Sequence, residues 1–136
     1  MRDLFVGTWT LNPTKSTFDA NHQPSAATMQ FEMGEDGTYV LKAQGVNQKG
    51  EPVTERPATL IPDGRAYPVP DFSGLSAVTT RPDPHTLRAE CRREDGSLVG
   101  EGSYVVSGDG ASLTATTAGF DTQLRRFEQK TVWDRR

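Results

Sequence analysis

Cysteine and histidine are scarce in this sequence, which has one cysteine, Cys91, and two histidines, His22 and His85. A lone cysteine excludes an internal disulfide and leaves the redox compartment open. These three residues cannot form an ordinary zinc site without carboxylate ligands, and their spacing matches no zinc motif. Motifs for a nucleotide, a dinucleotide cofactor or a serine nucleophile are also missing. We therefore expect no metal and no cofactor.

Long apolar runs and an excess of positive charge are missing too. No apolar stretch reaches the roughly 18 residues that a membrane helix needs, and the formal net charge is −3. A protein that binds nucleic acid or anionic membranes would carry a basic stripe, so neither partner is expected. We expect a soluble protein, cytoplasmic as written, or secreted or periplasmic if a signal peptide has been removed. The oligomeric state stays open.

Helix signals are almost absent, whereas turn signals recur roughly every 8–12 residues, an interval typical of β-barrels and β-sandwiches. The turns are rich in Gly, Asp, Asn and Pro, and Asp-Gly pairs such as Asp63-Gly64 suit tight hairpins. The pattern predicts one domain, residues 1–136, folded as an all-β, up-and-down antiparallel barrel. Ten strands are expected, near residues 4–12, 27–34, 38–46, 51–61, 65–69, 75–80, 85–93, 97–107, 111–119 and 122–134.

The longest gap between predicted strands is residues 13–26. It contains Pro13, Asn21 and Pro24, which disfavour a helix of more than about one turn. A loop of this length is usually functional or disordered. Its one large apolar residue, Phe18, either covers the mouth of the barrel or belongs to a mobile surface loop.

Alternate residues of a strand face opposite sides of a sheet, so each predicted strand divides into an inward and an outward set. The inward set combines large side chains with very small ones. The large members are Trp9, Met29, Phe31, Tyr39, Tyr104, Phe127 and Trp133. The small members are Ala43, Gly45, Ala89, Gly100, Gly102 and Ala115. This mixture predicts a void lined by aromatic rings, as in a ligand site, although glycines in strands also mark bends in a barrel.

Two polar residues, Arg125 and Gln129, are predicted to face inward on the last strand. An inward arginine needs an acidic side chain or an anionic ligand as its partner. The alternative is that Arg125 extends to water from the end of the strand. Both residues are therefore candidate polar contacts of a ligand.

Titratable residues give few candidates for catalysis. In the strand near residues 51–61 the apolar residues do not keep one phase, so either Glu55 or Arg56 faces inward. An inward Glu55 would be a general base or the ion-pair partner of an inward arginine. Cys91 is expected to be a small apolar filler, and His85 a solvated turn residue. His22, in the long gap, is open to a role as a gate or a proton shuttle.

Several motifs resemble known families. The ends of the chain, FVGTW at residues 5–9 and VWDR at 132–135, resemble the intracellular fatty-acid-binding proteins of the calycin superfamily, which are ten-stranded barrels. Nearly the whole chain resembles bacterial lipocalin-like proteins of unassigned function. That second likeness rests on GTWTLNPTKS at 7–16, DGRAYPV at 63–69, and VVS before GDG at 105–110. Both resemblances imply a calycin-type barrel.

The sequence departs from the fatty-acid-binding proteins in two ways. Those proteins carry an inward arginine two residues before an inward aromatic on the last strand, where it holds a carboxylate. Here these positions are Thr131 and Trp133. They also carry a helix-turn-helix lid after the first strand, and residues 13–26 are too short and too rich in helix breakers for one. Fatty-acid binding is therefore not implied.

The leading hypothesis is a protein that binds a small apolar or aromatic molecule inside the barrel. The predicted ligand-binding residues are Trp9, Met29, Phe31, Tyr39, Tyr104, Arg125, Phe127, Gln129 and Trp133. One alternative is a cofactor-free isomerase, cyclase or hydratase in the same cavity, with Glu55 and either Tyr39 or Tyr104 as its acid/base pair and no catalytic residue firmly assigned. Another is a structural module with a filled barrel that works through its outer surface.

Overall fold

A computed structural model describes residues 4–17, 26–34, 37–47, 49–54, 58–69, 73–120 and 126–136. Within these ranges the chain forms eleven β-strands and almost no helix. The strands are β1 (Gly7–Thr17), β2 (Ala26–Met33), β3 (Tyr39–Val46), β4 (Pro52–Thr54), β5 (Ala58–Leu60), β6 (Ala66–Pro68), β7 (Leu75–Asp83), β8 (Thr86–Arg93), β9 (Leu98–Val106), β10 (Ser112–Phe120) and β11 (Arg126–Arg135).

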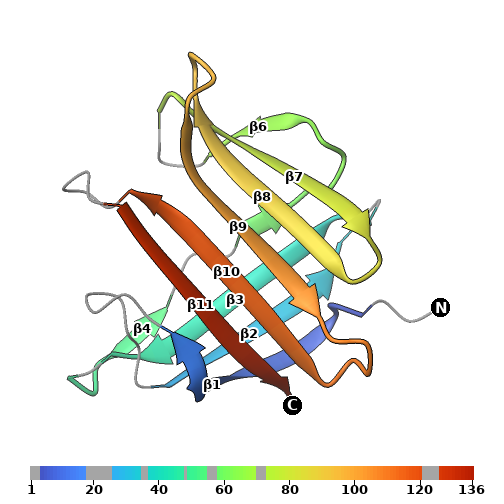
Figure 1. Cartoon of the computed structure of the whole chain (residues 1–136), viewed down its shortest axis with the longest axis vertical. Coiled ribbons are helices and arrows are strands. Elements are labelled where there is room, and N and C mark those ends of the chain that lie inside the picture. The colour runs from blue at the N-terminus through green and yellow to red at the C-terminus, as the bar shows by residue number, and fades with distance from the viewer. Residues whose placement is uncertain are drawn as a thin grey trace.

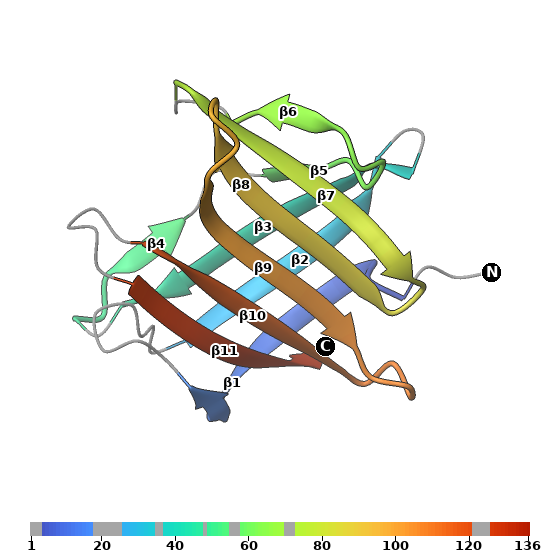
Figure 2. The same ribbon diagram turned by 45° about the horizontal axis from the view of Figure 1, so that its top comes forward.

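The strands form one antiparallel sheet in the order β4-β3-β2-β1-β11-β10-β9-β8-β7-β6, with β5 also paired to β3. The sheet curls so that β2 and β3 lie behind β8, β9 and β10 (Figures 1 and 2). The first and last strands pair, with Trp9 opposite Arg135 and Leu11 opposite Trp133. This confirms the predicted up-and-down architecture. Among the described residues β6 pairs with β7 alone, so the barrel is not fully closed between β6 and the β4/β5 edge.

Two predicted boundaries were wrong. The single strand expected near residues 51–61 is two short strands, β4 and β5, both paired to β3, which raises the count from ten to eleven. Glu55 and Arg56 lie outside the described residues, between these strands. The registers of β4 and β5 against β3 differ by one residue, since Gln44 is opposite Thr54 and Leu41 is opposite Ala58. A shift of one residue reverses the inward phase, which accounts for the predicted phase problem.

The second wrong boundary is the start of the loop. It was expected at Pro13, but β1 continues to Thr17. The pairing of β1 with β11 shifts register between Asn12 and Thr17, as at a β-bulge. The Ser16 hydroxyl compensates there: it accepts a hydrogen bond from the Val132 N–H at 2.8 Å and donates to the Asn12 carbonyl at 2.8 Å. The hydroxyl therefore bridges the Val132 N–H and the Asn12 carbonyl at the point where the register shifts. Residues 18–25, including Phe18 and His22, lie outside the described ranges.

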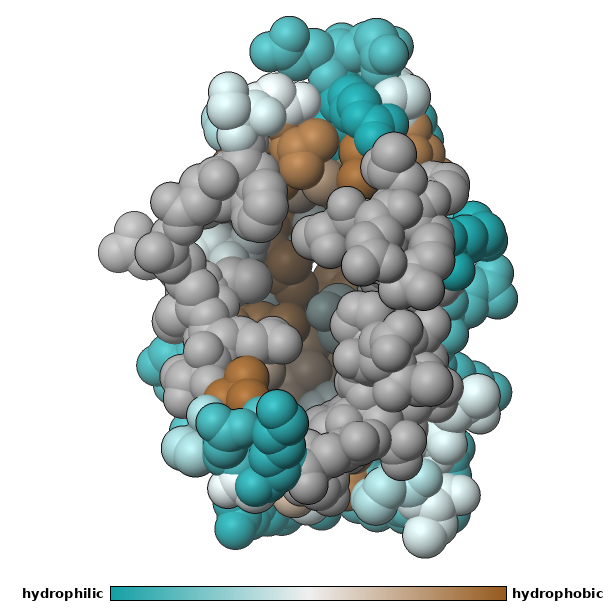
Figure 3. Space-filling view, turned by 90° about the vertical axis from the view of Figure 1, so that its left-hand side faces the viewer, coloured by the Kyte–Doolittle hydropathy of each residue, from teal (hydrophilic) through white to brown (hydrophobic). Residues whose placement is uncertain are grey.

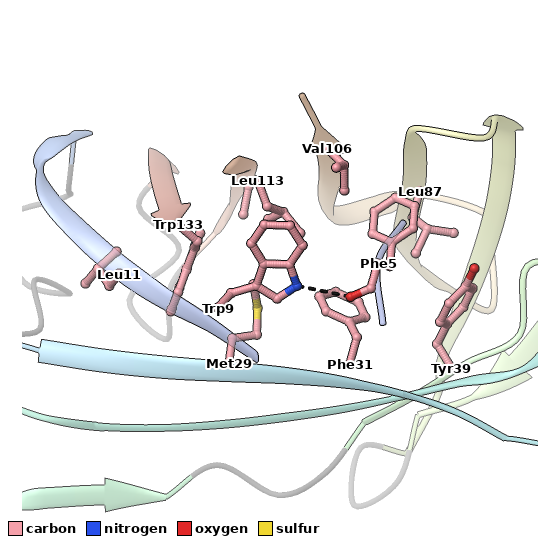
Figure 4. Packing of buried hydrophobic residues seen from close by; sticks show 11 residues of the cluster. Phe5, Trp9, Leu11, Met29, Phe31, Tyr39, Leu87, Val106, Leu113 and Trp133 are labelled. Carbon is pink, nitrogen blue, oxygen red and sulfur yellow. Dashed lines mark hydrogen bonds between the residues drawn. The ribbon is translucent and has the colours of Figure 1, made fainter. Parts of the chain in front are cut away.

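Large buried side chains gather at one end of the barrel, beside the β2–β3, β7–β8 and β9–β10 hairpins (Figure 4). We call this group the packed cluster. Its largest fully buried members are Trp9, Tyr39, Phe5, Phe31, Leu87, Leu113 and Val106. The rings of Phe5 and Phe31 lie 5.7 Å apart, and those of Phe5 and Tyr39 5.9 Å apart. This end of the barrel is therefore a solid core.

Arg135 fastens the packed cluster to both ends of the chain. Its guanidinium lies 4.2 Å from the centre of the Trp9 ring. It donates hydrogen bonds to the carbonyls of Gly110 (2.7 Å), Val6 (3.1 Å) and Leu4. Gly7 leaves room for it, because a Cβ there would lie 2.9 Å from the guanidinium, and its φ of +141° suits glycine. The Trp9 indole N–H in turn donates to the Phe5 carbonyl at 3.0 Å (Figure 4).

Candidate ligand-binding site

The inward positions at the other end of the barrel carry small side chains. Strand register aligns them in two neighbouring rows that cross β10, β9, β8 and β7, and we call these rows the small-residue wall. The first row is Thr117, Gly102, Ala89 and Thr79, and the second is Gly119, Gly100, Cys91 and Ala77. On β11, Gln129 extends the first row, opposite Thr117.

Strands β2 and β3, which lie across the barrel from this wall, are small at the same end. Ala27 is opposite Gly45, and Met29 is opposite Ala43. The structure explains why residue 45 is a glycine: a Cβ there would come within 2.5 Å of the Ala26 carbonyl oxygen. At this position a side chain is therefore excluded by the neighbouring strand.

The barrel is hollowed at this end. Figure 3 views the side where β4 and the start of β11 lie, and apolar residues line the depth of the recess. Thr117 faces inward by register and is nevertheless exposed to solvent. Most of the small-residue wall is only half-buried, whereas the packed cluster is buried. We call this recess the hollow.

The structure places the predicted aromatic site residues largely in the packed cluster. Trp9 and Tyr39 are 0% exposed and Phe31 is 1% exposed. Met29 and Trp133 are also buried, at the edge of that cluster. Tyr104 is half-buried, with its ring 5.6 Å from that of Phe31. By register, Tyr104 lies in the row next to the small-residue wall and Met29 lies opposite Ala43, whereas Trp133 is one row further away.

The polar candidates on β11 fall into different groups. Gln129 lies on the inward face of the strand, and its Oε1 is shielded from solvent without a hydrogen-bond partner. Phe127 is opposite Gly119, but the orientation of its side chain lies outside the described part. Arg125 and Glu55 are outside the described residues, so their predicted roles stay predictions.

Two inward arginines at the packed end were not identified from the sequence as important. Arg135 is described above. Arg81 donates to the Tyr39 hydroxyl at 2.6 Å and to the Pro84 carbonyl at 3.1 Å, and its guanidinium is 5.8 Å from the centre of the Phe5 ring. Both lie just beyond the predicted strand ends, at residues 80 and 134. If the alternation of inward and outward residues is continued past those ends, it predicts that both arginines face inward.

The titratable groups in turns face solvent. The carboxyl groups of Asp95 and Asp109 have pKa values below the ordinary one, because each accepts hydrogen bonds from a serine hydroxyl and a backbone N–H. The hydrogen bond from the Tyr67 hydroxyl similarly lowers the pKa of Asp63 and raises that of Tyr67. His85 lies in the β7–β8 turn as predicted, but it is half-buried and not fully solvated, with Nδ1 3.2 Å from the Val106 carbonyl oxygen. In the described ranges, no three His, Cys, Asp or Glu side chains are grouped to hold a metal ion.

Cys91 gives a reporter inside the small-residue wall. Burial raises the pKa of its thiol, an effect that nearby Arg93 partly offsets. The thiolate is the reactive form, so alkylation of the folded protein by iodoacetamide should rise with pH at a higher midpoint than in urea-unfolded protein. Mass spectrometry of timed samples measures both midpoints. The samples cover about pH 7 to 11, a range that includes the ordinary cysteine pKa of about 8.5. A folded midpoint at or below the unfolded one would contradict the burial of this thiol.

A second recess of about 220 Å³ lies on the outer face of β8, β9 and β10. Its outward-facing lining side chains are Arg88, Glu90, Glu101, Ser103, Thr116 and Ala118. Glu90 is already paired with Arg92 at 2.7 Å. This outer recess lies on the opposite side of the sheet from the hollow.

Solved structures share this fold along the whole chain. The wild-type fluorescent protein UnaG is similar at a TM-score of 0.62 and 14% identity, with 100% of both chains covered. As-p18, an extracellular fatty acid binding protein, matches at a TM-score of 0.54 and 14% identity over 98% of this chain and 97% of its own. Lobster apocrustacyanin A1 matches at 0.51 and 15% over 99% of this chain and 62% of its own. No family model and no curated protein matches the sequence. The antiparallel β-barrel fold expected from the sequence is thereby confirmed.

Proposed function

We propose that this protein binds a small apolar or aromatic molecule in the hollow. The observation that carries the proposal is the separation of side-chain sizes along the barrel. Large inward residues form the packed cluster at one end, and small ones form the wall at the other. Interiors of proteins are otherwise packed closely, so a recess lined by small residues beside a rigid floor is suited to a ligand.

The lining supports an uncharged ligand. Apolar residues line the depth of the hollow (Figure 3). Thr131, which occupies the position of the carboxylate-binding arginine of fatty-acid-binding proteins, donates its hydroxyl proton to the Ala115 carbonyl at 3.3 Å. That proton is therefore not available to a carboxylate. As-p18 is a fatty acid binding protein by name, which supports a small hydrophobic ligand in a barrel of this fold.

Catalysis has less support. The proposed acid/base pair needs a tyrosine in the cavity, but Tyr39 is fully buried and its hydroxyl accepts a hydrogen bond from Arg81. Tyr104 is the one half-buried candidate. Because the described aspartates with shifted pKa values lie in turns, they do not supply an interior base. Binding without chemistry is the function that the geometry supports best.

The test is native mass spectrometry of the protein as purified, combined with titration of N-phenyl-1-naphthylamine, an uncharged aromatic fluorophore. We expect an excess mass that disappears on denaturation, or saturable fluorescence enhancement when the purified protein is empty. A barrel that carries no extra mass and leaves the fluorophore unchanged would contradict the proposal and favour the structural-module alternative.

A further inference from the structure

We propose that the ligand carries a hydrogen-bond donor, a hydroxyl or N–H group, which binds Oε1 of Gln129. This inference rests on the proposed function, because it assigns the chemistry of a ligand in the same hollow. It starts from a single atom. In the described part of the chain, Gln129 Oε1 is the buried side-chain oxygen that lacks a hydrogen-bond partner.

The position of Gln129 places the residue beside the hollow, although its Oε1 is shielded from solvent. The residue lies opposite Thr117, which faces inward by register and is exposed. Two residues further along the same face are Thr131 and then Trp133, both buried. Gln129 therefore lies between the mouth of the barrel and the edge of the packed cluster, where a ligand would meet it.

The polar groups beside Gln129 are already paired and do not satisfy it. The Trp133 indole N–H donates to the Thr131 hydroxyl at 2.9 Å, and that hydroxyl donates to the Ala115 carbonyl. This chain of bonds ends on the backbone of β10 and leaves no proton for the amide oxygen. A buried acceptor without a partner destabilises a folded protein, and an apolar side chain of similar length would avoid the cost.

An unpaired acceptor at this position favours ligands that carry a hydrogen-bond donor. A ligand hydroxyl or N–H restores the hydrogen bond that the amide oxygen lost on leaving water. An ether, a ketone or a carboxylate presents a second acceptor to the amide oxygen. Two acceptors form no hydrogen bond, and their partial negative charges repel each other. Sites built to pair with a donor reject analogues that lack it, because the protein atom is again left unpaired.

The experiment compares three uncharged naphthalenes that differ at one position. 2-Naphthol offers a donor, 2-methoxynaphthalene offers an acceptor alone, and 2-methylnaphthalene offers neither. Dissociation constants are measured by equilibrium dialysis for the wild type, for Gln129→Met, and for Lys130→Met as a control on the outward face of the same strand. Methionine keeps the length of glutamine and removes its hydrogen-bonding groups.

We expect the wild type to bind 2-naphthol about tenfold more tightly than either analogue, the typical effect of one net hydrogen bond. Gln129→Met should lose this preference while it binds 2-methylnaphthalene at least as well as the wild type. Its thermal unfolding midpoint without ligand should be higher. Lys130→Met should behave as the wild type does.

The outcomes separate this inference from the proposed function. Equal binding of all three naphthalenes by the wild type would overturn the donor requirement and leave ligand binding intact. A loss of affinity in Gln129→Met that is the same for all three would show that the side chain only shapes the hollow, and would also overturn it. Binding of 2-methoxynaphthalene as tight as that of 2-naphthol would reverse the polarity inferred here. If none of the three binds to the wild type, both proposals fail.

Discussion

Replacing Arg135 with alanine should lower the free energy of unfolding by about 3 kcal/mol, a large part of the roughly 5–15 kcal/mol that is typical of whole domains. The substitution removes hydrogen bonds to three backbone carbonyls, those of Leu4, Val6 and Gly110. It also removes the cation from the face of Trp9, a contact worth about 0.5–2 kcal/mol. The segment that carries Phe5 then loses its connection to the last strand.

Urea unfolding followed by tryptophan fluorescence measures this effect, and Arg136 provides the matched control. It is the adjacent arginine, it is exposed, and its backbone N–H, which alanine keeps, bonds to the Thr8 carbonyl at 2.9 Å. Arg136→Ala should change stability by less than about 0.5 kcal/mol. Arg135→Lys should restore little, because an ammonium cannot reproduce the planar fork of the guanidinium. Similar losses in Arg135→Ala and Arg136→Ala would show that charge alone, and not this geometry, matters.

A tryptophan in place of Thr117 should abolish binding of N-phenyl-1-naphthylamine, with an increase in the dissociation constant of at least about tenfold. The inward Thr117 is exposed inside the hollow, between Gly102 and Gln129 in the first row of the wall. An indole there would occupy the volume that the ligand needs. Because it would also bury apolar surface that the hollow leaves in water, the variant should be at least as stable as the wild type.

Thr116→Trp is a close control for this variant. Thr116 is the same residue type on the same strand, is equally exposed, and points to the other side of the sheet. It lines the outer recess, so the two variants distinguish the two places where a ligand could bind. Thr116→Trp should bind the fluorophore normally. The reverse result, with binding lost only in Thr116→Trp, would move the site to the outer face of β8–β10 and contradict the proposed function.

The fold was largely predictable because its main signals are local. Alternation of apolar and polar residues and Asp-Gly turns mark most strands within a few residues of their observed ends. The extension of β1 past Pro13 was not predictable in this way. It depends on Ser16 reaching across to Val132, a contact between segments far apart in the sequence that no local pattern contains.

The site was predicted in composition and not in arrangement. The sequence correctly showed that large and small residues share the inward face, but it did not show that they separate along the barrel. That separation is a property of register: Gly102 lies between Ala89 and Thr117, while Leu87 lies beside Tyr104. Register between strands is set by the assembled sheet, so the small-residue wall becomes visible only when the strands are aligned.

The seam between β1 and β11 also has a consequence for the order in which the protein can fold. Arg135 bonds to Val6 across 129 residues of sequence, and β1 gains its second neighbour only when β11 is available. On a translating ribosome β1 therefore waits for almost the entire domain to be synthesised, and contacts this distant also form slowly. During that time β1 and β10 both present unpaired strand edges, which are templates for pairing with other chains. The nascent barrel is thus most exposed to aggregation just before its last strand is added, and chaperone binding at that stage would protect it.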